Sequence, residues 1–157
     1  MSRQRKFEIL CVVALIVFIG FISRETAYSD KTASEVAESI TQSYDVSELK
    51  SIDRNKIRED FTIDFTQVDS FKYYASDSIM NVDELMIIKL REEVKPDEIK
   101  AKIEKRVTDK QALFEGYAPE QSALLKEYIL ADDKGFVFYA VGKDAEKALA
   151  AFKSSIR

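Results

Sequence analysis

A chain of 157 residues, 46% hydrophobic and 33% charged, has the length and composition of one globular domain. Residues 1–23 hold three of its 24 basic side chains and one of its 28 acidic ones, so the remainder carries 21 positive and 27 negative charges. This acidic excess disfavours nucleic-acid binding, because like charges repel. The absence of histidine excludes Ser-His-Asp and Cys-His catalytic arrangements and the commonest zinc ligand.

The single cysteine, Cys11, lies in an apolar segment, so no disulfide can form within the chain and the folded part has no thiolate site. The four glycines are scattered rather than grouped in a phosphate-binding loop. No stretch has the spacing of oxygen ligands that calcium requires. We therefore expect no cofactor and no metal.

The N-terminus begins with a basic patch at residues 1–6, from Arg3, Arg5 and Lys6, and continues with an uninterrupted apolar run. We predict a transmembrane helix over 7–23 with residues 1–6 in the cytoplasm, because positive charge keeps the leading end inside. Sixteen residues would span roughly 24 Å of a bilayer core of roughly 30 Å. The residues expected to contact membrane lipid are Phe7, Ile9, Leu10, Val12, Val13, Leu15, Ile16, Val17, Phe18, Ile19, Phe21 and Ile22.

The same segment also fits a signal peptide, with small residues at Ala27 and Ser29 placed for cleavage near Ser29 and secretion. A lipoprotein signal is excluded, because Cys11 has almost no apolar run before it. A buried core helix is disfavoured, because no polar stripe breaks the run. The prediction is thus a single-pass protein of the cell membrane with its domain outside, and a secreted protein is the alternative.

Residues 24–31 are polar and predict a tether, and residues 32–157 predict the extracytoplasmic domain. Thr32 and Glu35 have capping-box spacing before a short amphipathic helix that ends near Ser43. Residues 45–69 are less regular. They indicate helical turns at Leu49, Ile52, Ile57 and Phe61, and then extended chain at Ile63, Phe65 and Val68.

The second half of the chain has clearer periodicity. Strands are predicted at 71–74 and 85–90, a helix that begins at Pro96 and ends at Gly116, and a shorter helix from Pro119. Strands at 128–131 and 136–141 follow, joined by a turn in which Gly135 supplies a positive φ. Asp144 is expected to cap a final helix.

This order, ββααββα, predicts an α+β fold. Short connections make each strand pair antiparallel. The amphipathic helices need an apolar surface, and one face of a four-stranded antiparallel sheet supplies it. We therefore expect a two-layer sandwich with the helices on one face, preceded by the N-terminal transmembrane helix.

The junction between the two middle helices holds the candidate ligand or partner residues Tyr117, Glu120 and Gln121. The alternative is a helix stop and restart, with Tyr117 on the core and Glu120 near free amides. Carboxylates could run acid–base chemistry without histidine if two converged in a cleft. Most of them stand at turns or helix starts, where they cap or are solvated, so we expect no catalytic residue. They are Asp60, Asp64, Asp69, Asp77, Asp83, Asp97, Glu98, Asp132 and Asp133.

Five stretches follow one another as in a bacterial family, domain of unknown function 4358: Asp83–Lys89, Ile99–Phe114, the Tyr117-x-Pro119-x-Gln121 junction, Gly135–Phe138 and Asp144–Phe152. The chain resembles this family over residues 46–155. The resemblance implies an exported, membrane-attached protein of the cell envelope of Gram-positive-type bacteria, often a lipoprotein, and implies no activity. The missing acylation cysteine departs from that pattern and favours a helical anchor.

The expected function is a non-catalytic binding or assembly module on the outer membrane face, with an unknown protein partner or a second copy. A small-ligand-binding domain using Tyr117–Gln121 is the first alternative, and a carboxylate-only hydrolase is the second.

Overall fold

The computed structural model describes residues 12–15, which are helical, and 28–157. Most of the predicted anchor (7–23), its topology residues Arg3, Arg5 and Lys6, and most of the tether lie outside these ranges. None of the helices in the described ranges has the length and apolar character that a bilayer crossing requires.

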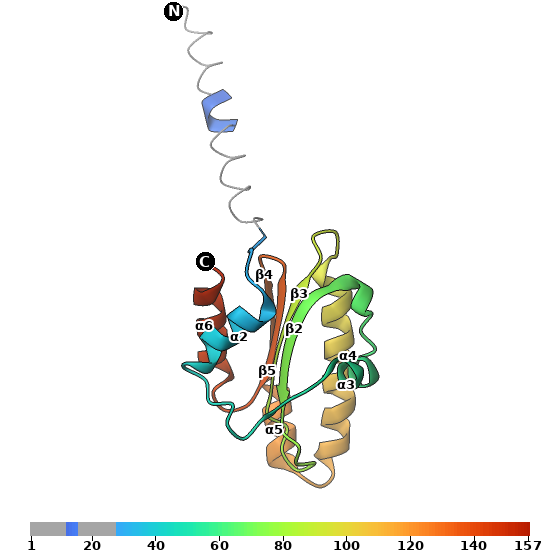
Figure 1. Cartoon of the computed structure of the whole chain (residues 1–157). Helices are drawn as coiled ribbons and strands as arrows, with labels where there is room; N and C mark the ends of the chain where they lie inside the picture. The colour runs from blue at the N-terminus through green and yellow to red at the C-terminus, as the bar shows by residue number, and fades with distance from the viewer. Residues whose placement is uncertain (1–11, 16–27) are drawn as a thin grey trace, which may run out of the picture.

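Residues 28–157 form one antiparallel sheet with helices on both sides of it (Figure 1). The described domain begins with three helical segments and one short strand, and from β2 onward it follows the predicted ββααββα order. The elements are α2 (Ala33–Thr41), β1 (Lys50–Ser51), α3 (Arg54–Phe61), the 3-10 turn η1 (Phe65–Gln67), β2 (Val68–Ala75), β3 (Glu84–Leu90), α4 (Pro96–Glu115), α5 (Pro119–Lys126), β4 (Ile129–Asp133), β5 (Phe136–Val141) and α6 (Ala145–Ser155).

The sheet has five strands in the order β1-β2-β3-β5-β4. The two predicted hairpins, β2–β3 and β4–β5, meet through antiparallel pairing of β3 with β5, in which Met86 lies opposite Tyr139. The prediction of four strands was wrong at one edge, where Lys50 and Ser51 pair with Ala75 and Tyr74. Two residues are too few to show strand periodicity, so that pairing is decided by the partner strand.

The prediction that helices cover one face was also wrong. One face of the sheet packs against α3, α4 and α5, and the other packs against α2 and α6, so the domain has three layers. The reason is visible in β5, whose six residues are all buried. Phe136 and Phe138 point to the α2–α6 side, whereas Val137 and Tyr139 point to the α3–α5 side. A strand that is apolar on both faces needs a cover on both.

Several local predictions are confirmed. Thr32 and Glu35 form the capping box of α2. The apolar stripe of α4, from Ile99 to Phe114, is buried, and Gly116 is its C-cap. The predicted strand at 71–74 lies within β2, where Tyr73 is buried and Tyr74 is partly exposed. Asp144 stands at the N-cap of α6 but makes no capping hydrogen bond. Its carboxylate instead lies 2.6 Å from the amine of Lys147.

The end of the tether is fixed against the domain. The Tyr28 hydroxyl donates to the Glu92 carbonyl at 2.9 Å, and the Ser29 amide donates to the Lys134 carbonyl at 3.1 Å. The Tyr28 ring also lies over Gly135 in the β4–β5 turn. Residues 28 and 29 are therefore an ordered part of the domain.

Candidate functional site

The first residue of β3, Glu84, is 2% exposed although it carries a carboxylate. Arg106 on α4 donates to both of its oxygens at 2.8 Å, and Lys110, one turn further along α4, donates to Oε1 at 2.7 Å. The Tyr139 hydroxyl on β5 donates to Oε2 at 2.9 Å. Four donors from two elements thus satisfy one buried acid, which is the condition for keeping a charge inside a fold.

The ionised form of this acid is favoured by its partners. Burial by itself raises the pKa of Glu84, but the charges and hydrogen bonds of Arg106 and Lys110 outweigh burial and hold that pKa below its ordinary value. Burial raises the pKa of Tyr139 well above its ordinary value, and the Glu84 charge adds to this. The tyrosine is therefore a neutral donor to a charged carboxylate.

The guanidinium of Arg106 also lies against an aromatic ring. It stands 4.3 Å from the ring centre of Phe61, the last residue of α3, in cation–π geometry. The Phe61 ring meets the Tyr73 ring edge-on at 5.6 Å. These contacts bring α3, α4 and β2 together around the buried charges.

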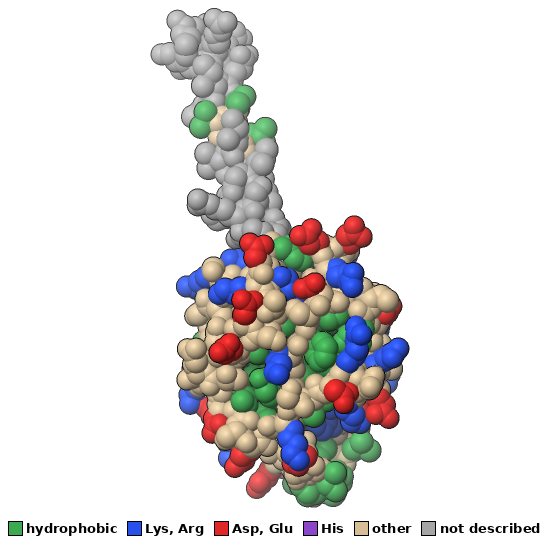
Figure 2. Space-filling view, viewed as in Figure 1, with side chains coloured by type: hydrophobic (Ala, Val, Ile, Leu, Met, Phe, Trp, Pro, Cys, Tyr) green, Lys and Arg blue, Asp and Glu red, His purple; other side chains and the backbone are tan. Residues whose placement is uncertain are grey.

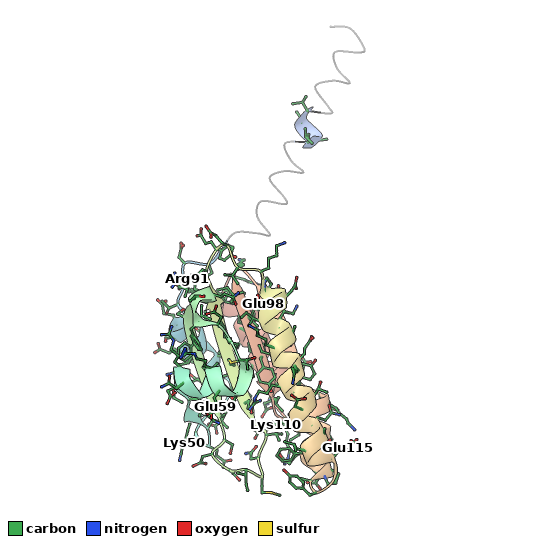
Figure 3. All side chains as sticks on the ribbon, turned by 90° about the vertical axis from the view of Figure 1, so that its right-hand side faces the viewer. Lys50, Glu59, Arg91, Glu98, Lys110 and Glu115 are labelled. Atoms are coloured by element: carbon green, nitrogen blue, oxygen red, sulfur yellow. The ribbon has the colours of Figure 1, made fainter. Side chains whose placement is uncertain are left out.

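A cleft of about 310 Å³ opens beside this network. Figure 3 looks onto this side of the molecule, with α3, which bears Glu59, and α4, which bears Lys110 and Glu115, over the same face of the sheet. The polar wall of the cleft includes Glu84, Arg106 and Lys110. Its apolar wall includes Ile52, Ile79, Leu113 and Phe114.

Exposed apolar side chains gather around the mouth of the cleft. In residues 28–157 the large hydrophobic side chains that are exposed, apart from Tyr28, are Ile79 (85%), Leu113 (68%), Tyr117 (58%) and Met80 (51%). Ile79 and Leu113 line the cleft, Met80 follows Ile79, and the Tyr117 ring lies 5.2 Å from that of Phe114. We call these four residues the distal apolar end. They belong to the β2–β3 loop and to the junction of α4 with α5, which lie at the end of the domain away from the N-terminal segment, and hydrophobic side chains are exposed at that end (Figures 1 and 2).

The three predicted ligand residues do not form one site in the structure. Tyr117 belongs to the distal apolar end, and Glu120 is exposed in the first turn of α5. The Gln121 side chain accepts a hydrogen bond from the Val82 amide at 3.0 Å, which ties α5 to the β2–β3 loop. Gln121 also lines a hollow of about 320 Å³ that includes Tyr44 and Asp83. Tyr117 does not line this hollow.

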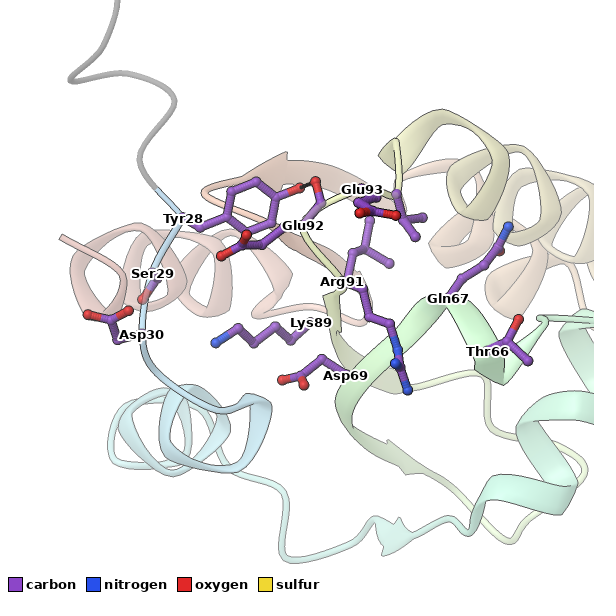
Figure 4. Close-up of a pocket in the computed structure, with 12 residues that line it drawn as sticks. Tyr28, Ser29, Asp30, Thr66, Gln67, Asp69, Lys89, Arg91, Glu92 and Glu93 are labelled. Carbon is purple, nitrogen blue, oxygen red and sulfur yellow. Dashed lines mark hydrogen bonds between the residues drawn. The ribbon is translucent and has the colours of Figure 1, made fainter.

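A larger hollow, of about 620 Å³, lies at the opposite end of the domain beside Tyr28 (Figure 4). Side chains of both signs line it, among them Asp69, Lys89 and Arg91. The Lys89 amine donates a hydrogen bond to the Lys31 carbonyl at 2.7 Å, which helps to hold the tether in place. We interpret this hollow as the seat of the tether, since its wall is built partly from residues 28–30.

Carboxylates do converge at the cleft, where Asp60, Asp77 and Glu84 form part of the wall. Each has a cationic partner: Lys56 at 2.7 Å from Asp60, Lys50 beside Asp77, and Arg106 with Lys110 at Glu84. In the described residues no group of three or more acidic or cysteine side chains is arranged to hold a metal ion.

Sequence reasoning missed the Glu84 network. The available signal was a glutamate at the head of a buried apolar strand, which requires a cation. A second signal was the i, i+4 spacing of Arg106 and Lys110 on α4, beside the buried Val107. What joins these residues is the packing of α4 on β3, which no local pattern reveals.

Comparison with known proteins identified one family. The family described as "Domain of unknown function (DUF4358)" matches residues 42–142, a span that contains Glu84, Arg106, Lys110, Tyr139 and the distal apolar end. No curated protein and no solved structure matched the chain.

Proposed function

This chain belongs to the DUF4358 family, and from its surface we propose that it is a membrane-anchored, extracytoplasmic, non-catalytic module that binds a partner protein of the bacterial cell envelope. The observation that carries this proposal is the distal apolar end. Scattered apolar residues are normal on a surface, but a group of them at one place marks an interaction site. Aromatic residues and methionine are enriched in such sites, as in Tyr117 and Met80.

The arrangement of the two ends supports the anchored form. The tether joins the domain beside Gly135, and the distal apolar end lies at the other pole. A chain held at its N-terminal end would therefore point its apolar end away from the membrane.

Cleavage near Ser29 would remove Tyr28, whose ring and hydroxyl pack on the domain. Intact-mass measurement of the membrane-associated protein tests whether the N-terminal segment is retained. The mass of a chain that starts at Met1 supports an anchor, and the mass of a chain that starts at Asp30 overturns it.

Site-specific photo-crosslinking tests the binding surface. A photoreactive side chain is placed at Leu113 or Tyr117 in the full chain, in cells that produce it naturally, with Lys153 on the opposite helix α6 as the control position. We expect one discrete protein adduct from both distal positions and none from Lys153. An adduct of the chain with itself would identify the partner as a second copy. No adduct, or the same adducts from all three positions, would overturn the proposal.

The small-ligand alternative keeps its own test. Gln121 lines a hollow, as a ligand residue should, but its side-chain oxygen already accepts a hydrogen bond from the Val82 amide. A ligand screen by thermal shift, repeated with Glu120→Ala and Gln121→Ala, distinguishes this alternative. A compound that stabilises the wild-type chain and neither variant would favour it over the partner-binding proposal.

A further inference from the structure

We propose that the cleft beside the distal apolar end recognises a carboxylate carried on an apolar, extended segment of the partner protein, with Lys110 as the residue that binds the carboxylate. This inference rests on the proposed function and names the chemistry of the partner.

The network in the cleft wall has a local excess of positive charge. Two cations, Arg106 and Lys110, share one carboxylate, Glu84, and all three side chains are buried or partly buried. The other charged groups of the cleft balance without them, since Lys56 pairs with Asp60 and Glu59 and Lys50 pairs with Asp77, so the cleft as a whole is close to neutral and the excess is confined to the network. An anionic group that enters the cleft would neutralise that charge where water screens it poorly.

The hydrogen bonding of Lys110 identifies where the anion would bind. Glu84 already accepts from four donors, and Arg106 donates to both of its oxygens. A lysine ammonium has three donors. In residues 28–157 the Lys110 amine donates one hydrogen bond, to Glu84, and its side chain is 21% exposed. Lys110 therefore has donors to offer at the cleft wall.

The shape and lining of the cleft identify the rest of the ligand. A volume of about 310 Å³ is at the small end for ligand sites. It has room for one or two side chains rather than for a folded surface. Ile79 and Leu113 stand at its rim, so apolar side chains next to the carboxylate would contact them. The matching segment is an extended stretch with one acidic residue between apolar ones.

The test uses the full chain in detergent micelles and two blocked peptides, acetyl-Leu-Asp-Phe-Leu-amide and its Asn counterpart, which differ in one charge. Methyl NMR signals of Ile79, Met80 and Leu113 report occupancy. We expect the Asp peptide to bind roughly five- to tenfold more tightly than the Asn peptide, the scale of a partly exposed charge-assisted hydrogen bond. Lys110→Gln should abolish this preference. Lys110→Arg and the exposed control Lys105→Gln should retain it.

The outcomes separate the two proposals. Equal binding of both peptides at the three methyl groups, or an Asp preference that survives in Lys110→Gln, would overturn the role of Lys110 and leave the apolar binding surface standing. A peptide preference that also vanishes in Lys105→Gln would show general charge attraction and likewise overturn it. No methyl shift with either peptide would overturn this inference, and the crosslinking experiment would then decide the proposed function separately.

Discussion

Gly135 occupies the second position of the two-residue turn between β4 and β5, with φ of +85°, after Lys134 at +47°. An ideal Cβ placed on it would come within 2.3 Å of the Tyr28 ring. One residue thus meets two requirements, the backbone of the turn and the seat of the tether. Only a glycine meets both without strain.

We expect Gly135→Ala to lower the free energy of unfolding by about 1–2 kcal/mol, because alanine is strained at positive φ and displaces the Tyr28 ring. The matched control is Gly116→Ala, at φ −84°, where an added Cβ would meet open space. That variant should be neutral or stabilised by up to about 1 kcal/mol. Urea unfolding of both variants checks the pair, and equal stability losses would contradict the role given to Gly135.

At the scale of elements, α4 is joined to the sheet by charge as well as by its apolar stripe. The Arg106 and Lys110 side chains reach Glu84 on β3, and Tyr139 reaches it from β5. Removing one member of a buried ion pair leaves the others without their partner. The network therefore helps to hold α4 against the sheet and forms one wall of the cleft.

Glu84→Gln should cost about 3 kcal/mol of stability at neutral pH, since it leaves two partly buried cations without a counter-charge. The folded-state pKa of Glu84 is below its ordinary value of 4.5. Its contribution is therefore complete above that value and is lost as the pH falls through the folded pKa. The stability difference between wild type and Glu84→Gln should be constant from pH 6 to 8 and shrink below about pH 4.5. Denaturant unfolding across this range checks it, and a difference that grows at low pH would contradict the pairing.

A hydrogen bond also joins the helix α5 to the β2–β3 loop. Gln121 accepts from the amide of Val82, which is fully buried, whereas Glu120 is exposed. We expect Gln121→Ala to cost about 1–2 kcal/mol, because the buried amide loses its acceptor. Glu120→Ala should change stability by less than about 0.5 kcal/mol. Thermal unfolding of the two variants distinguishes them, and similar losses would show that this hydrogen bond is unimportant.

At the scale of the whole molecule, the domain has two unlike poles. The tether and a hollow of mixed charge lie at one, and the distal apolar end lies at the other. Side chains that stabilise a core are normally buried, so Ile79 and Leu113, at 85% and 68% exposure, contribute little to the core. The proposed partner binding would account for their place on the surface.

The double substitution Ile79→Ser with Leu113→Ser should leave the unfolding free energy within about 0.5 kcal/mol of wild type, because both side chains are already solvated. The same variant should lose the partner adduct formed through Tyr117. Urea unfolding and crosslinking on the same preparation check both halves. A large loss of stability would show that these side chains belong to the core.

The sequence by itself determined the helices of the second half, both hairpins and the Gly135 turn, because each depends on residues close together along the chain. It also determined the family. Tertiary structure alone decided the fifth strand, the cover on the second face and the joining of Glu84 to Arg106, Lys110 and Tyr139. These depend on contacts between segments far apart in the chain, where the pairing energy is set by the partner surface and not by local periodicity.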